Sequence, residues 1–198
     1  TGLTTAQMRD KANYPSWDFN TTWALVNGQL HLLGEYNGAR PISSLADLQL
    51  LSNLSGTYFL AADIDVTGNW TPIGDAANPF TGTLRGNGYT LSGLTITGSA
   101  SPYLGLFGYT QGAAIIGLNL ANVNIVAGTG NLSVGSLAGY NGAGSIVAGC
   151  TSTGTVTAGG LGSNIGGLVG YNAGSFIGST NNAIVTGNGD GSNIGGLA

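Results

Sequence analysis

The chain has 198 residues, of which 37 are glycine and only 6% are charged, and its formal net charge is -4. A chain of this length can bury one sizeable core, and its 42% apolar content favours a packed fold, with low-complexity disorder as the alternative. Four basic residues cannot neutralise a nucleic-acid backbone, and no apolar run approaches the roughly 20 residues of a membrane span, so we expect neither nucleic-acid binding nor membrane insertion.

Residues 1–40 differ from the rest of the chain and gather aromatic residues after Pro15. We expect them to form a small linker or capping unit. Trp17 and Trp23 are candidate binding residues, either as an exposed aromatic patch for a partner or as buried plugs at the end of the fold. His31 has no nearby nucleophile or metal-ligand companion, so we expect no catalytic role for it.

Residues 43–53 predict a short helix. Ser44 is followed three residues later by Asp47, which is a capping-box pattern, and leucines recur after it at helical intervals. Because terminal units of repeat proteins shield edge strands, we expect this helix to cap the fold that follows. Residues 41–100 are therefore predicted to hold the capping helix and the first, irregular coils.

Acidic residues are too sparse to predict a catalytic centre. The alternation around Asp63 and Asp65 places both carboxylates on one side of a strand, where the pair could bind a calcium ion. A solvated or turn-capping pair is the alternative, and no other cofactor is expected. Residues 86–198 contain one charged residue, Asp190, so we expect no cluster of catalytic carboxylates and no enzyme activity.

Residues 101–198 contain a strict internal repeat. Tyr109, Tyr140 and Tyr171 follow one another at intervals of 31 residues, and leucine and glycine columns keep the same spacing. The last copy is shorter by about two residues. The predicted apolar columns pair Ile115 with Ile146, Ile116 with Val147, Ile125 with Val156, Val156 with Val185, and Ile165 with Ile194.

Each period contains three short β-like pieces, at residues 135–140, 145–151 and 153–157 of the middle copy, separated by glycine-rich turns. A repeat of about 31 residues is too short for a propeller blade of four strands, which needs about 40 to 45. We therefore predict an all-β fold, a parallel β-helix (β-solenoid) with three-strand coils of about 31 residues and a short N-terminal capping helix.

The repeated positions also supply the candidate binding surface. We expect Tyr109, Tyr140 and Tyr171 to form either a stacked internal column or an exposed row that binds a sugar or a protein. Threonine pairs at residues 95–97 and 155–157 have the spacing of a water-ordering row. The intervening copies replace several of these threonines, so we expect no uniform threonine array and no ice binding.

The phrases "GSLAGYNGAGSI" and "GGLVGYNAGSF" resemble the GLUG-type repeat of large exported bacterial proteins. The preceding "LSGTYFLAADIDVTGNWTPIG" and "FTGTLRGNGYTLSGLTI" are similar to the segment that leads into such repeats, and "WDFNTTWALVNGQLHLL" is similar to the linker between arrays. Proteins with these repeats include filamentous-haemagglutinin-like adhesins of the two-partner secretion type and some surface-anchored, IgA-cleaving proteases. The resemblance implies an extracellular, right-handed β-helix, and it implies no particular activity.

We therefore expect a non-catalytic extracellular segment of a bacterial surface or secreted protein that serves adhesion, a biofilm matrix or filament assembly. The expected partners are glycans or other copies of the chain, end to end. The alternative is a passive stalk or spacer of a secreted protease or polysaccharide-degrading enzyme. Because "GSNIGGLA" stops inside the repeated phrase, we expect further repeats in the full-length chain.

Overall fold

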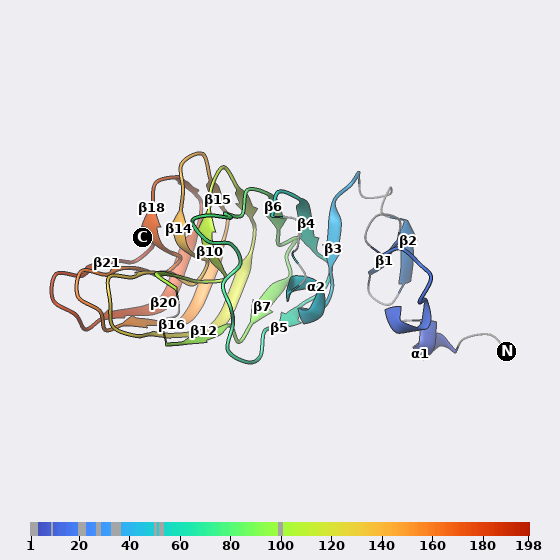
Figure 1. Cartoon of the computed structure of the whole chain (residues 1–198), viewed down its shortest axis with the longest axis horizontal. Helices are drawn as coiled ribbons and strands as arrows, with labels where there is room; N and C mark the ends of the chain where they lie inside the picture. Colours follow the sequence, from blue (N-terminus) through green and yellow to red (C-terminus); the bar gives the residue numbers. More distant parts are fainter. Residues whose placement is uncertain are drawn as a thin grey trace.

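The computed structural model of the chain describes residues 4–8, 10–19, 23–26, 29–32, 37–49, 51, 54–98 and 101–198. Its main body is a parallel β-solenoid of about five turns with almost no helix, which confirms the predicted fold class. The N-terminal residues lie at one end of the long axis and the last coils at the other (Figure 1).

The N-terminal unit has its own short elements. They are the helix α1 (Thr5–Met8), the 3-10 helix η1 (Lys11–Asn13) and the antiparallel strands β1 (Trp23–Val26) and β2 (Gln29–Leu32). The strand β3 (Arg40–Ile42) then begins the parallel pairing of the solenoid.

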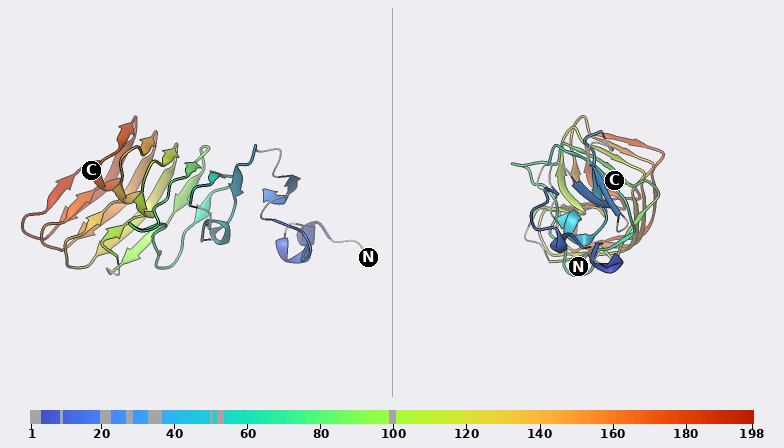
Figure 2. Two further views of the ribbon diagram at one scale, coloured as in Figure 1. Left: turned by 45° about the horizontal axis from the view of Figure 1, so that its top comes forward. Right: turned by 90° about the vertical axis from the view of Figure 1, so that its right-hand side faces the viewer.

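Four parallel sheets run along the described part of the solenoid, and Figure 2 shows their strands stacked from coil to coil. Sheet I contains β3, β4 (Thr57–Leu60), β6 (Thr83–Arg85), β11 (Ala114–Ile116), β15 (Ile146–Ala148) and β19 (Ser175–Ile177). Sheet II contains β5 (Ile64–Asp65), β7 (Thr90–Ser92), β8 (Thr95–Thr97), β12 (Asn119–Ala127), β16 (Thr151–Ala158) and β20 (Thr180–Gly187). Sheet III contains β9 (Tyr103–Leu104), β13 (Ser133–Val134), β17 (Asn164–Gly166) and β21 (Asn193–Gly195). Sheet IV contains β10 (Phe107–Thr110), β14 (Ala138–Asn141) and β18 (Val169–Asn172).

The number of strands per coil corrects the sequence prediction. Three pieces were expected in the middle copy, but that coil consists of four strands, β13 to β16. The predicted piece at residues 135–140 bends sharply between β13 and β14. At this corner the next coil comes so close to Gly135 that an added Cβ would lie against the carbonyl oxygen of Leu168, while Leu137 is fully buried. Glycine permits the close approach, and the buried leucine holds the corner to the core.

The predicted capping helix is confirmed in a shorter form. At the start of the helix α2 (Leu45–Gln49), Asp47 N donates to Ser44 Oγ at 3.2 Å, which is the N-cap half of a capping box. The Asp47 carboxylate accepts a hydrogen bond at 3.1 Å from Ser43 N, one residue before the N-cap, instead of from Ser44 N. Leu48 is completely buried in the core of the solenoid. The helix therefore covers the N-terminal end of the core (Figure 2), whereas residues 50, 52 and 53 of the predicted helix lie outside the described residues.

The core consists of apolar columns that run along the solenoid. Leu84, Ile115 and Val147 are neighbours in sheet I, and each is buried to 1% exposure or less. In sheet II, Ile125 pairs with Val156, which pairs with Val185, as predicted. Each coil thus removes its apolar side chains from water by placing them against the equivalent side chains of the next coil.

One predicted alignment is wrong by a single residue. Ile115 pairs with Val147 rather than with Ile146, and Ile116 pairs with Ala148 rather than with Val147. The turn that precedes β15 is one residue longer than the turn before β11, so Ile146 points outward and is 40% exposed. Because side chains alternate along a strand, a shift of one residue exchanges the buried face for the exposed face.

A bulge in β12 restores the 31-residue spacing between equivalent residues of the two coils. The register between β12 and β16 shifts after Leu120, so two residues of β12 lie opposite one residue of β16. Asn122 has a positive φ of 54° there, and its amide donates to Thr153 Oγ1 at 3.1 Å. The extra turn residue and the bulge compensate for each other, and the tyrosine spacing is preserved.

Gly154 lies opposite this bulge and provides a test of the close packing between coils. It has a φ of 114°, and an added Cβ would overlap the carbonyl oxygen of Val123. We expect Gly154→Ala to lower the free energy of unfolding by about 3 kcal/mol or more, because backbone strain and a backbone clash add. The matched control is Gly178→Ala, where φ is 57° but the position is open, and it should cost only about 1–2 kcal/mol. Urea unfolding measures both, and equal losses would contradict the proposed packing.

Candidate functional site

The three repeated tyrosines stack on the outer side of sheet IV. Tyr109 pairs with Tyr140, and Tyr140 pairs with Tyr171, in the register predicted from the sequence. The ring centroids of Tyr109 and Tyr140 are 4.3 Å apart with an interplanar angle of 11°, and those of Tyr140 and Tyr171 are 4.9 Å apart at 8°. We call these three residues the tyrosine ladder. Parallel strand pairing spaces the rings at stacking distance.

Tyr103 extends the aromatic group, although the sequence analysis did not identify it. Its ring lies edge-on to Tyr109 at 5.2 Å and to Tyr140 at 5.8 Å. In its own column, Ser133 and Asn164 replace the tyrosine in the following coils. The repeat therefore contained no signal for Tyr103, which reaches the ladder from sheet III.

A second ladder occupies the inner side of the same strands. Thr110 Oγ1 donates to Asn141 Oδ1 at 2.9 Å, and Asn141 Nδ2 donates to Asn172 Oδ1 at 2.7 Å. Thr110 and Asn141 are fully buried, so their polar groups depend on these partners. The register of sheet IV is thus fixed from both sides, by stacked rings outside and by hydrogen-bonded amides inside.

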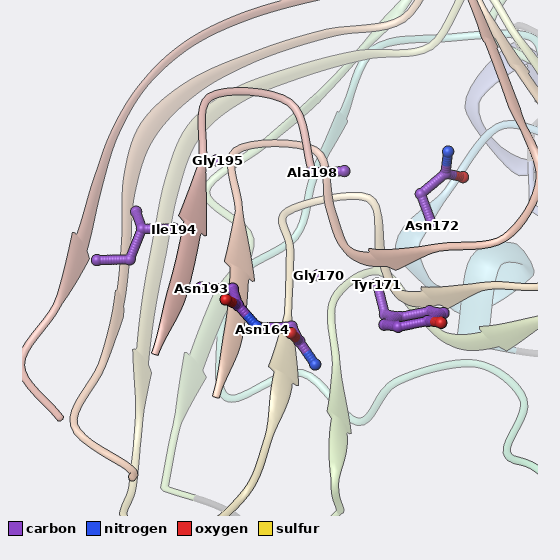
Figure 3. A pocket seen from close by; sticks show the side chains of 8 residues that line it. All are labelled: Asn164, Gly170, Tyr171, Asn172, Asn193, Ile194, Gly195 and Ala198. Carbon is purple, nitrogen blue, oxygen red and sulfur yellow. Dashed lines mark hydrogen bonds between the residues drawn. The ribbon is translucent and has the colours of Figure 1, made fainter. Parts of the chain in front are cut away.

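The stacking decides which ring faces a ligand could reach. Tyr140 lies between two rings, so neither of its faces can receive a sugar. Tyr171 is 46% exposed, and its outer side lines a pocket of about 410 Å³ together with Asn164 and Asn193, whose side chains are hydrogen-bonded at 2.9 Å (Figure 3). Within the described coils, the ladder therefore covers both ring faces of Tyr140 and one ring face of Tyr171.

Burial also affects the ionisation of Tyr109. Desolvation raises the pKa of Tyr109 above its ordinary value of 10.0, and the hydrogen bond to Tyr140 raises it further. Its phenol therefore stays neutral at physiological pH. The ladder presents a row of aromatic edges and hydroxyl groups.

Comparison with known protein families identifies the coil that contains the central tyrosine. Residues 130–157 match the GLUG motif. The match spans β13, β14, β15 and most of β16, and it confirms the GLUG-type repeat expected from the sequence. The buried Leu137, the ladder residue Tyr140 and the buried Asn141 all lie within it.

Two curated proteins are similar to parts of the chain. Halomucin of Haloquadratum walsbyi is 36% identical over 132 residues, which cover 58% of this chain and 1% of that protein. A putative Gly-rich membrane protein of Evansella cellulosilytica is 34% identical over 111 residues, which cover 50% of this chain and 13% of that protein. The chain thus matches only a small part of each relative, and no solved structure matches it.

Trp17 and Trp23 lie outside the GLUG repeat, in the N-terminal unit. Their rings are 4.5 Å apart, and Tyr14 lies 4.9 Å from Trp17. Trp17 is 38% exposed, so the interpretation of Trp17 as a buried plug is wrong. The buried tryptophan of the solenoid is Trp70, whose Nε1 donates to the carbonyl oxygen of Leu106 at 3.0 Å. A binding role for Trp17 and Trp23 stays a prediction.

Asp63 and Asp65 lie on the outer side of β5 and the turn before it, as the alternation predicted. Asp63 Oδ1 accepts a hydrogen bond from Thr90 N at 2.8 Å, so this carboxylate satisfies a backbone amide of the neighbouring coil. Among the described residues, no group of three or more His, Cys, Asp or Glu side chains could hold a metal ion. Calcium binding by this pair stays a prediction. No helix in the described ranges is long and apolar enough to span a bilayer.

Cys150 follows the β15 strand of the GLUG repeat and is completely buried. Its thiol lies 3.5 Å from the carbonyl oxygens of Ile115 and Ala148. Burial raises the pKa of this thiol, with weaker opposing contributions from backbone hydrogen bonds. A buried thiol that stays protonated is a packing residue rather than a nucleophile.

The tyrosine ladder should contribute to stability most strongly at its centre. Tyr140→Ala removes two stacking contacts, so we expect it to lower the free energy of unfolding by about 2–4 kcal/mol. Tyr171→Ala removes one contact at a half-exposed position and should cost about 1 kcal/mol. Urea unfolding followed by circular dichroism measures the difference. A larger loss for Tyr171→Ala than for Tyr140→Ala would contradict the ladder geometry.

The environment of Cys150 predicts low thiol reactivity. At mildly alkaline pH, we expect Ellman's reagent to label the folded chain at least about tenfold more slowly than the chain unfolded in guanidinium chloride, because the buried thiol is inaccessible and has a raised pKa. Cys150→Ser provides the blank, since the sequence has one cysteine. Labelling at equal rates in both states would show that the thiol is accessible.

Proposed function

We propose that the chain is a non-catalytic segment of a surface-associated repeat protein and that it adheres to glycans. The observation that carries this proposal is a solenoid surface almost without charge: residues 86–198 contain Asp190 as their one charged residue. Such a surface offers hydroxyl, amide and aromatic groups. It suits many weak contacts with a neutral partner rather than ionic binding.

The comparisons support the surface-associated part of the proposal. The chain contains a GLUG motif, and it is similar to a halomucin and to a protein named as a membrane protein. We infer an extracellular or cell-surface location from these similarities. The repeat architecture suits this role because coils can be added without changing the surface that each coil presents.

A catalytic role has no support in the described residues. The outward carboxylate of Asp63 is engaged with a backbone amide, and the Cys150 thiol is buried and protonated. Catalysis at a nucleophile requires an adjacent activating base. The chemistry of the described side chains therefore favours binding.

Self-assembly through the N-terminal end is disfavoured by the capping helix. Another copy could extend the sheets there only by pairing with exposed strand edges. The helix α2 covers this end with the buried Leu48. We therefore favour glycans over end-to-end copies as partners. The passive spacer remains the second candidate function, because sheets that continue from coil to coil make a stiff rod.

Glycan binding distinguishes the adhesive function from the spacer. The chain should be biotinylated at an added terminal tag and loaded on streptavidin, so that several copies raise a weak affinity by avidity. On a glycan array we expect it to retain neutral glycans, with a signal that changes less than about twofold between low and high salt, because the surface has few charges to screen. Absence of retained glycans would support the spacer, and a strong salt dependence would contradict binding through an uncharged surface.

A further inference from the structure

The outer face of sheet II is a second extended surface, distinct from the tyrosine ladder. Its strands β12, β16 and β20 lie side by side along the solenoid (Figure 1). Along β16 every outward side chain is a threonine, at residues 151, 153, 155 and 157, while Ser152, Val156 and Ala158 point inward and are fully buried. We call the outward side chains of β12, β16 and β20 the threonine–asparagine face.

The equivalent positions of the neighbouring strands keep small or branched uncharged side chains. Thr155 lies between Asn124 of β12 and Ile184 of β20, and Thr157 lies between Val126 and Thr186. In the sequence alone, these replacements interrupt the threonine row. In the structure they form one face, on which hydroxyl and amide groups alternate with exposed methyl groups such as those of Ile184, which is 68% exposed.

Contacts between coils hold this face in place. Thr151 Oγ1 donates to Asn119 Oδ1 at 2.9 Å, and Thr155 Oγ1 donates to Asn124 Oδ1 at 3.3 Å. Threonine, valine and isoleucine are also restricted at χ1 because they branch at Cβ. A partner that binds to side chains already ordered in this way requires less loss of conformational entropy.

The chemistry of the face selects a neutral partner with many hydroxyl groups. The outward positions of β12, β16 and β20 carry no charge and no aromatic ring. Threonine hydroxyls and asparagine amides both donate and accept hydrogen bonds, as sugar hydroxyls do. The exposed methyl groups match the C–H surfaces of a sugar ring. An anionic polymer would gain no ionic contact here.

The size of the face argues for a polymer rather than a folded protein. Strands of eight residues are about 26 Å long, and three of them at a spacing of about 4.8 Å give a face of roughly 250–400 Å². A stable protein interface needs about 800 Å² from each partner. A polysaccharide chain can instead combine small contacts on successive sugars and successive coils.

We propose that the threonine–asparagine face binds a neutral polysaccharide chain and is the adhesive surface of the solenoid. This inference rests on the proposed adhesive function and adds the face and the class of ligand. The tyrosine ladder is the less suitable surface, because its stacking covers both ring faces of Tyr140.

The test is cosedimentation of the whole chain with insoluble neutral polysaccharides, cellulose and chitin, and with heparin beads as the anionic arm. The first variant, Thr155→Lys with Asn182→Lys, places two long charged side chains on the face. The matched control, Ile146→Lys with Ile177→Lys, adds the same charge at outward positions of sheet I in the same two coils. A gentler variant, Thr155→Val, keeps the side-chain shape and removes one hydroxyl, and circular dichroism verifies the fold of each.

We expect the chain to sediment with at least one neutral polysaccharide. The Thr155→Lys/Asn182→Lys variant should bind this polysaccharide about tenfold more weakly, and Thr155→Val should bind it a few-fold more weakly. The sheet I control should bind it like the original chain. Equal binding by the Thr155→Lys/Asn182→Lys variant would overturn the assignment of the face and leave the adhesive function standing. Binding to no neutral polysaccharide and to no glycan on the array would overturn both. Thermal hysteresis that the lysines abolish, without polysaccharide binding, would assign the face to ice instead.

Discussion

The structure depends on parallel, in-register pairing between each coil and the next. A single coil has short strands of two to nine residues and cannot bury its apolar side chains alone. Pairing places each buried residue against its equivalent, so Leu84, Ile115 and Val147 form one column. The hydrogen bonds between coils and the apolar columns therefore stabilise the same register, and neither can shift without the other.

This constraint explains why similar side chains recur on both sides of sheet IV. Once the backbone is in register, any residue that repeats must meet its own copies about one strand spacing away. Tyrosine and asparagine both tolerate this arrangement, since rings stack and amides form hydrogen-bonded chains. The outer tyrosine ladder and the inner chain from Thr110 to Asn172 are two results of one geometry. The regular spacing of these side chains is thus explained by the stacking of the coils. It indicates a binding role only where the side chains leave a surface open to a ligand.

The outer faces of the sheets are the surfaces of the stacked coils that remain open to a partner. Each coil that presents the same groups adds another weak contact with an extended ligand. An uncharged surface can therefore bind such a ligand through avidity, even when each single contact is weak. Charge is almost absent from residues 86–198, which favours a neutral ligand in the proposed binding and predicts that this binding changes little with salt. Between the two candidate surfaces, the threonine–asparagine face keeps its polar groups outward, whereas the tyrosine ladder covers most of its aromatic faces with its own rings.

The sequence by itself determined the period, the tyrosine register, the helix N-cap at Ser44, and the all-β solenoid, because each depends on local spacing or on identity between copies. Only the tertiary structure decided the four strands per coil, the one-residue shift at Ile146, the contribution of Tyr103 and the continuity of the face around Thr155. Turn lengths and bulges change where a strand begins without changing the period, so they are invisible to an alignment of repeats. Which residues meet between coils, and which face stays open to a ligand, is fixed when the corners bend and the coils stack.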